Sequence, residues 1–204
     1  MSNETNLQKG QQVACDLTVE RFSSADPAEL ARRCRAEYTD AGLRLIYLGQ
    51  AYIIRWPSGE VEKEGSEESI PLSMKVLLLN YVLSAHGEPT GELISFRDIP
   101  GAATYEPSFN KRALNPLVKT FDGKPDLLYA AAERLGGTRA SIADASVTIP
   151  VLPLLQVTYG IWHGDEEFPA SGVILFDSSA RRLLPIECLV AAASNGVYAL
   201  MKSI

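Results

Sequence analysis

The stretch "LQVTYGIWHGDEEFPASGVILFD" (155–177) sets two strand-like segments on either side of a polar one. In the first segment Val157, Tyr159 and Ile161 alternate with small or polar residues, which is the period of a strand with one buried face. The second segment, "GVILF", is a continuous apolar run. Between them, residues 163–171 are rich in acidic and turn-forming residues. The stretch therefore predicts an antiparallel hairpin whose loop lies in water.

The same stretch also suggests a metal site. Imidazole and carboxylate groups are ligands that transition metals accept. The hypothesis uses four side chains, which are His163, Asp165, Glu167 and Asp177. Their spacing matches no H-x-H or H-E-x-x-H motif, so convergence would depend on the fold. Asp177 can instead cap the turn that follows it through "SSA". The sequence leaves a solvated hairpin loop and a metal centre both open.

Upstream, a wide apolar helix is predicted over "IPLSMKVLLLNYVLSAHG" (70–87). Apolar residues recur there at spacings of three and four and cover most of the helix surface, so the helix belongs in the centre of the fold. Gly87 is suited to end it, and Pro89 cannot continue it. Before it, alternating residues in "GLRLIYLGQAYIIRW" (42–56) predict a meander of two or three antiparallel strands.

Further helices are predicted from capping and breaking residues. Asp26 is an N-cap candidate for a helix over 27–37, with Pro27 at its first position. The other predicted helices cover 107–121, 125–135 and the segment after Pro185, the last with a break near Asn195–Gly196. We find neither an internal repeat nor a linker between domains.

These elements predict an α+β fold in which a meander and a C-terminal hairpin pack against several helices, including the buried central one. The expected organisation is a single compact domain over 25–204. Residues 1–24 are polar and are expected to form a flexible tail that can include a short helix at "CDLTVERF" (15–22).

Composition narrows the class of protein. The 204 residues are 46% hydrophobic and 22% charged, with a net charge of −6, which is ordinary for a soluble globular domain. Lys and Arg do not cluster as phosphate binding requires, which excludes nucleic acid as a partner. No apolar run reaches the ~18 residues of a membrane span. The three cysteines form no C-x-x-C pair, so neither a disulfide framework nor a metal cofactor is predicted, and the expected location is cytoplasmic.

No catalytic signature is present. No serine lies in a G-x-S-x-G elbow, and no glycine-rich segment has the lysine of a phosphate loop. Loops often carry binding groups, and two turn-rich segments mix aromatic and charged residues. The predicted ligand- or partner-binding residues in these segments are Phe96, Arg97, Trp162, Asp165 and Phe168. No catalytic residue is predicted.

Three blocks together have a recognisable order and spacing. They are "YLGQAYIIRWPSGEV", "LLLNYVLSAHGEPTGELISFRDIPGAATY" and "LPLLQVTYGIWHGDEEFPASGVILFDSSARRLLPIE". Over about Ala28 to Leu200 the chain resembles an uncharacterised prokaryotic family catalogued as domain of unknown function 3786. The resemblance implies a compact cytoplasmic domain and no assigned catalytic residues. In some relatives from anaerobic bacteria and archaea it implies a joined cysteine-rich iron–sulfur segment, which this sequence does not contain.

Two functions from different classes follow. The first is an accessory module that binds a small molecule, a metallocofactor or a protein through the predicted binding residues. The second is a metal-dependent, hydrolase-like enzyme that uses the acidic loop around His163 and Asp165. Imidazole and carboxylates that converge in a concave pocket would favour the enzyme, and acids that face solvent would favour the module.

Overall fold

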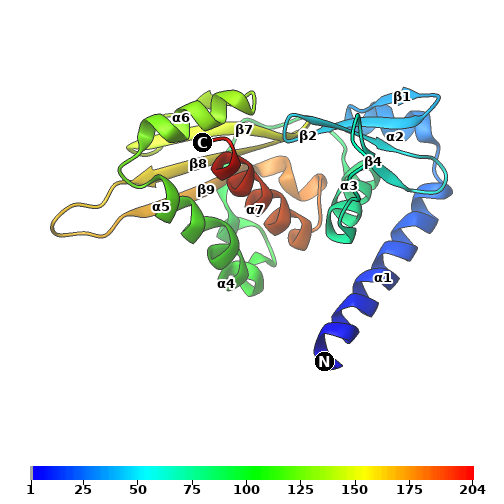
Figure 1. The fold of residues 1–204 in the computed structure, drawn as a ribbon, viewed down its shortest axis with the longest axis horizontal. Helices are drawn as coiled ribbons and strands as arrows, with labels where there is room; N and C mark the ends of the chain where they lie inside the picture. Colours follow the sequence, from blue (N-terminus) through cyan, green and yellow to red (C-terminus); the bar gives the residue numbers. More distant parts are fainter. Residues whose placement is uncertain (1) are drawn as a thin grey trace.

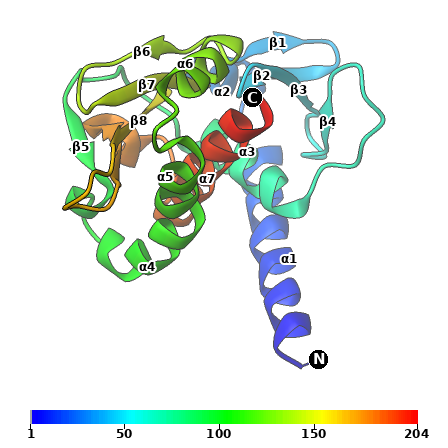
Figure 2. The same cartoon turned by 60° about the vertical axis from the view of Figure 1, so that its left-hand side comes forward.

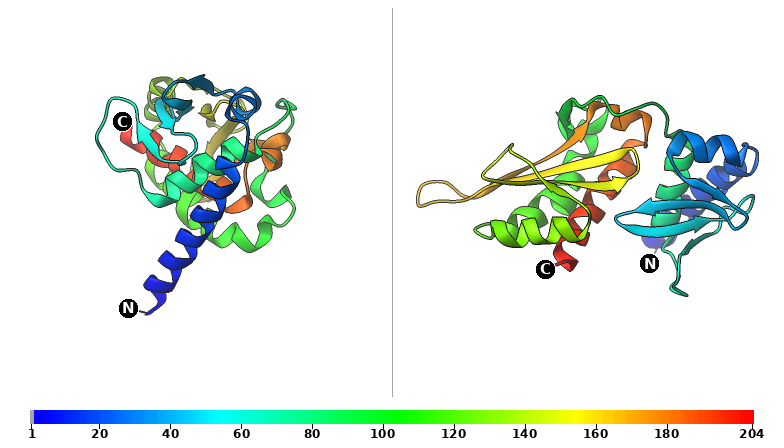
Figure 3. Two further views of the ribbon diagram at one scale, coloured as in Figure 1. Left: turned by 90° about the vertical axis from the view of Figure 1, so that its right-hand side faces the viewer. Right: turned by 90° about the horizontal axis from the view of Figure 1, so that it is seen from above.

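Two antiparallel sheets and the helices packed on them form the α+β fold that the sequence predicts (Figure 1). The structure, a computed structural model, describes the backbone of residues 2–204 and the side chains from Gln12 onward. The right-hand view of Figure 3 shows the two sheets side by side, each with its own helices. In the part of the chain that is described, no helix is both long and apolar enough to cross a membrane.

The first sheet is the predicted meander, and it has four strands in chain order. These are β1 (Glu37–Thr39), β2 (Gly42–Tyr47), β3 (Gln50–Ile54) and β4 (Val61–Lys63). The helix α2 (Pro27–Cys34) precedes them and begins as predicted. The carboxylate of Asp26 accepts hydrogen bonds from the N–H groups of Ala28, at 2.9 Å, and Glu29, at 3.4 Å. The helix ends earlier than predicted, because Arg35 takes the left-handed conformation.

Helix α1 (Ser2–Ser23) occupies the segment expected to be a flexible tail with a short helix. The structure makes it one continuous helix, which extends away from the rest of the molecule at its N-terminal end (Figures 1 and 2). Its C-terminal half packs against α3 (Leu72–Ser84). Cys15, Thr18 and Phe22, at spacings of three and four, are buried along that side. These contacts explain why a segment of polar composition is helical.

Helix α3 is the predicted central helix, and it is buried in its C-terminal half from Leu77 to Val82. The C-terminal helix α7 (Ile186–Lys202) is buried over more of its length. Helix α3 contacts α1, α2 and α7. Its first turns, over residues 72–76, are partly exposed.

The second sheet has five strands in the order β5-β9-β8-β7-β6. They are β5 (Leu93–Ser95), β6 (Thr138–Arg139), β7 (Ala145–Leu152), β8 (Leu155–Trp162) and β9 (Ser171–Asp177). The predicted C-terminal hairpin is confirmed as β8 and β9, which pair from Trp162–Ser171 to Val157–Phe176. Strand β7 was not predicted from the sequence. Its apolar residues run on into those of β8, and the tight turn between the two strands gives no clear break in the pattern.

The helices between β5 and β6 follow the predicted segments with one difference. The segment 107–121 is divided into α4 (Glu106–Phe109), a π-helical turn η3 (Asn110–Leu114) and α5 (Asn115–Phe121). The remaining elements are α6 (Pro125–Arg134) and three short 3₁₀ helices, η1 (Phe96–Asp98), η2 (Ala102–Tyr105) and η4 (Ser178–Arg182).

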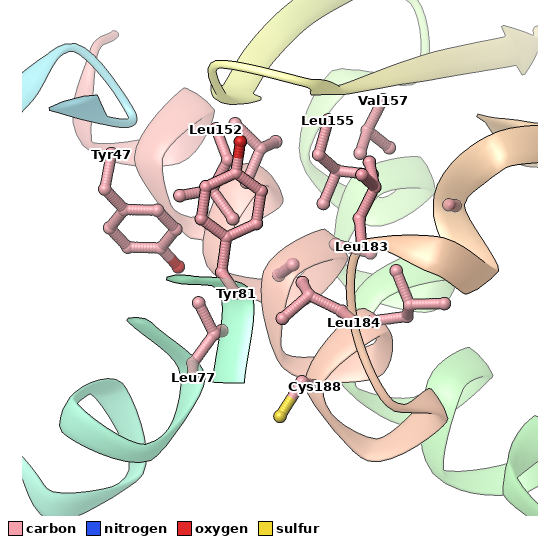
Figure 4. Close-up of a cluster of buried hydrophobic side chains, with 14 of the residues drawn as sticks. Tyr47, Leu77, Tyr81, Leu152, Leu155, Val157, Leu183, Leu184 and Cys188 are labelled. Atoms are coloured by element: carbon pink, nitrogen blue, oxygen red, sulfur yellow. The ribbon is translucent and has the colours of Figure 1, made fainter. Parts of the chain in front are cut away.

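One continuous cluster of buried side chains joins the two sheets. Figure 4 shows part of this cluster, with Tyr47 of β2 and Tyr81 of α3. Near them lie Leu152 and Leu155, on either side of the β7–β8 turn, and Leu183 and Leu184, which precede α7. The hydroxyl of Tyr81 donates to the carbonyl of Cys34 and accepts from the N–H of Leu154, both at 3.0 Å. The hydroxyl of Tyr47 accepts from the amide of Asn195 at 2.7 Å.

Helix α7 continues through Asn195 and Gly196, so the predicted break is wrong. The glycine serves close packing instead. A Cβ at Gly196 would overlap the hydroxyl of Tyr159, and this hydroxyl donates to the carbonyl of Ala193 at 3.1 Å. The glycine thus lets β8 approach the backbone of α7.

We predict that Gly196→Ala destabilises the protein. In an exposed helix interior this change would stabilise by about 1 kcal/mol, whereas overpacking against the Tyr159 hydroxyl costs on the order of 1–3 kcal/mol. Adding Tyr159→Phe removes the overlapping oxygen, so the double variant should be more stable than the sum of the two single effects implies. Denaturant unfolding of the four proteins measures this coupling, and strictly additive effects would contradict it.

Candidate functional site

A groove lies between β9 and the helical segment α4–η3. Its volume is about 370 Å³. The walls come from the end of β5, from η1, from α4 and η3, and from the outer part of β9. The lining residues are Ser95, Phe96, Arg97, Glu106, Phe109, Asn110, Leu114, Gly172, Val173 and Ile174. Two of the predicted binding residues, Phe96 and Arg97, are therefore part of one concave site.

The floor of the groove is aromatic. The rings of Phe96 and Phe109 stack with their centroids 4.1 Å apart and their planes 3° apart. Both rings also pack at 6.2 Å against Phe176 on β9. All three are buried and hold η1 and α4 on the sheet, and Phe96 and Phe109 also line the base of the groove.

The rim of the groove is polar. Arg97 forms an ion pair with Glu106, at 2.6 Å between Nη2 and Oε1, and its side chain is 74% exposed. Asn110 also lines the groove and is partly exposed. A guanidinium, a carboxylate and an amide are thus available to a bound molecule above the apolar floor.

The chain enters the groove by a sharp turn at the end of β5. The carboxylate of Asp98 accepts from the hydroxyl of Ser95 at 2.7 Å and from its N–H at 3.0 Å. These two hydrogen bonds lower the pKa of Asp98. The bond from the Ser95 N–H is one half of a capping box that starts η1 and ends β5 at Ser95. As a result, β5 pairs only with residues 175–177 of β9, and the rest of that edge faces the groove.

The hairpin loop is organised by one of its own acids. Asp165 Oδ1 accepts from the N–H groups of Phe168, at 2.7 Å, and Glu167, at 2.8 Å, which lowers the pKa of Asp165. Phe168 is 68% exposed and Trp162 is 41% exposed. The hairpin protrudes from the body of the molecule in Figure 1. Of the three predicted binding residues of this stretch, Trp162 ends β8 opposite Ser171 of β9, and Asp165 and Phe168 lie in the loop beyond.

The side chains of the metal hypothesis do not converge. Asp177 ends β9 six residues after Ser171, which places it about 20 Å along the strand from the hairpin loop. His163 instead contacts Asp122, with 3.3 Å between Nδ1 and Oδ1, and its Nδ1 accepts from the N–H of Gly123 at 3.0 Å. Among side chains that the structure describes, no group of three or more His, Cys, Asp or Glu is placed to hold a metal ion.

Asp177 has a structural role that the sequence partly indicated. Besides capping η4 through the N–H of Ser179, at 2.9 Å, its carboxylate accepts from the N–H groups of Thr90, at 3.0 Å, and Gly91, at 2.7 Å. Burial alone would raise its pKa, but the hydrogen bonds from Ser179, Thr90 and Gly91 outweigh burial and hold the pKa of Asp177 well below its usual range. The carboxylate thus ties the segment before β5 to the end of β9.

The cysteines stay outside the groove. All three are free and buried. Burial raises the pKa of Cys34 to about 11 and that of Cys188 to about 12, so both remain protonated thiols at neutral pH.

Sequence reasoning missed several groove residues. Asn110 and Leu114 stand in a segment predicted simply as helical, and Glu106 is separated from Arg97 by nine residues. One local feature pointed to the site. Gly172 is the second residue of β9, and a glycine within a strand often marks a place where another element approaches closely. Here a Cβ would lie 2.7 Å from Cγ2 of Val118 in α5.

Comparison with known proteins gives one match. A family described as a domain of unknown function (DUF3786) matches residues 26–199. No curated protein matches the chain, and no solved structure does.

We predict that Asp177→Asn destabilises the protein at neutral pH by about 2–3 kcal/mol, because an amide nitrogen replaces an acceptor oxygen among buried donors. The folded-state pKa of Asp177 is depressed, so its stabilisation is fully present above the unfolded-state pKa of about 3.9 and is lost as the pH falls below it. Unfolding titrations at pH 7 and in acid test this. The gap between wild type and variant should shrink in acid, and an equal gap at both pH values would contradict the assignment.

Proposed function

This chain belongs to the DUF3786 family, a domain of unknown function, and we propose that it is an accessory module whose binding site is the groove beside β9. The observation that supports this is the composition of the groove. An apolar aromatic floor, a few polar groups at the rim and a concave shape are the usual features of a ligand site. The predicted residues Phe96 and Arg97 lie in it.

The hairpin residues extend this proposal. Trp162 pairs with Ser171, the residue before Gly172 of the groove, so the loop begins where the groove ends. Trp162 and Phe168 offer exposed aromatic surface at that end. A ligand longer than the groove could contact both sets of predicted binding residues, with Asp165 holding the loop in shape.

A second hollow is larger but less suited to a ligand. It measures about 520 Å³ between α6 and β6. Its aromatic ring, Tyr129, is covered by the guanidinium of Arg139, 4.0 Å from the ring centroid. By contrast, the aromatic floor of the groove beside β9 has no cation above it among the residues described.

We predict that small aromatic and aliphatic fragments bind the groove. In a fragment screen followed by NMR of ¹⁵N-labelled protein, shift changes should concentrate on the amides of Phe96, Asn110 and Val173. Asn110→Trp fills the groove and should abolish these changes. Lys111→Trp is the matched control, because Lys111 is exposed on the same turn but does not line the groove. Shift changes that scatter over the surface, or that persist in Asn110→Trp, would count against the groove as the site.

A further inference from the structure

The outer edge of β9 has unpaired main-chain groups inside the groove. The N–H of Ser178 donates to the carbonyl of Glu92 at 2.8 Å, so the even-numbered residues of this strand face β5. Gly172 and Ile174 share that orientation but lie past the end of β5, whose pairing stops at Ser95–Leu175. Within the described residues, no backbone or side-chain group bonds to either residue on that side.

From Gly172 to Ile174 this edge has no charged side chain, no proline and no bulge. Natural edges are guarded by charged side chains, proline, bulges or a covering element. The segment from Gly172 to Leu175 is entirely apolar, and its pairing with β8 is regular. Figure 2 shows β5 at the outer side of the sheet and α4 below it, so the strand that would cover the edge is cut short.

The free part of the β9 edge has the length of a short strand. Four residues from Ser171 to Ile174 extend about 13 Å, and α4 with η3 closes the opposite side. In an added antiparallel strand, the residues opposite Gly172 and Ile174 point to the same face as these two. That face carries Phe109 and Leu114, so it suits apolar side chains at alternate positions.

We infer that the groove binds an extended peptide segment of a partner protein, which joins the sheet as an antiparallel strand in line with β5. The inference rests on the proposed function and names its ligand. Gly172 and Ile174 together offer two N–H and two C=O groups, spaced two residues apart. Another extended main chain can form hydrogen bonds with all four, whereas a compact small molecule would reach only some of them. The segment is uncharged and apolar at alternate residues, and the Asn110 amide is available to its backbone.

The free protein supplies the first test. In amide hydrogen exchange followed by NMR, the amides of Gly172 and Ile174 should exchange faster than the amide of Val173, which pairs with Gly160 of β8. Gly172 should exchange the faster of the two, because Ile174 is only 2% exposed. Protection of Gly172 and Ile174 in the monomer would show that the edge is already paired and would overturn the inference. Protection that grows with protein concentration, together with a dimer in light scattering, would assign the edge to a second copy instead.

The second test uses random linear peptides displayed on phage, selected on the wild type and counter-selected on Asn110→Trp. Enriched peptides should carry apolar residues at alternate positions, bind Lys111→Trp as they bind the wild type, and slow exchange at Gly172 and Ile174 by at least about tenfold. Methylation of peptide amide nitrogens that face β9 should abolish binding. Arg97→Trp, at the exposed rim, is a second blocking variant if Asn110→Trp does not fold.

The outcomes separate the inference from the proposed function. If no peptide is enriched over the blocked variant, or if bound peptides leave both amides unprotected, the peptide inference fails. Fragments that still bind the groove in that case leave the proposed function standing. If neither peptides nor fragments bind there, both fail.

Discussion

The hydroxyl of Tyr81 is the contact on which the joining of the two sheets depends. It is buried between the carbonyl of Cys34, at the end of α2, and the N–H of Leu154, in the β7–β8 turn. A buried hydroxyl must be paired, because an unpaired one costs the desolvation of the group. Burial raises the pKa of Tyr81, so the group stays protonated and both donates and accepts. It thereby sets the position of α3 relative to elements on both sides.

The other buried tyrosines extend this constraint to the groove. Tyr47 joins β2 to α7 through Asn195, and Tyr159 joins β8 to α7 through Ala193. Gly196 lets the Tyr159 hydroxyl approach α7, and Gly172 lets α5 approach β9. Strand β9 is thus held from its inner edge and from one face. Before Leu175 its outer edge has no neighbouring strand, because the chain leaves the sheet after Ser95.

Four aspartate side chains stabilise turns of the main chain. Asp26, Asp98 and Asp177 each accept main-chain N–H groups at the start of a helical turn, and Asp165 does so within the hairpin loop. Carboxylates stabilise such turns because they accept several donors at once and carry charge. Asp177 and Asp98 also act together on β5, since one ties its beginning to β9 and the other ends it.

The sequence by itself determined the features that depend on neighbouring residues. The hairpin, the meander, the apolar helix α3 and the caps at Asp26 and Asp177 follow from period and from donors within a few residues. Only the tertiary structure decided the rest. The unbroken α7, in which Gly196 packs against Tyr159, and the open edge at Gly172 and Ile174, where β5 stops pairing with β9, depend on residues far apart in the chain. Local propensity carries no information about which distant surface will meet a given residue, so the groove emerges only when the elements pack.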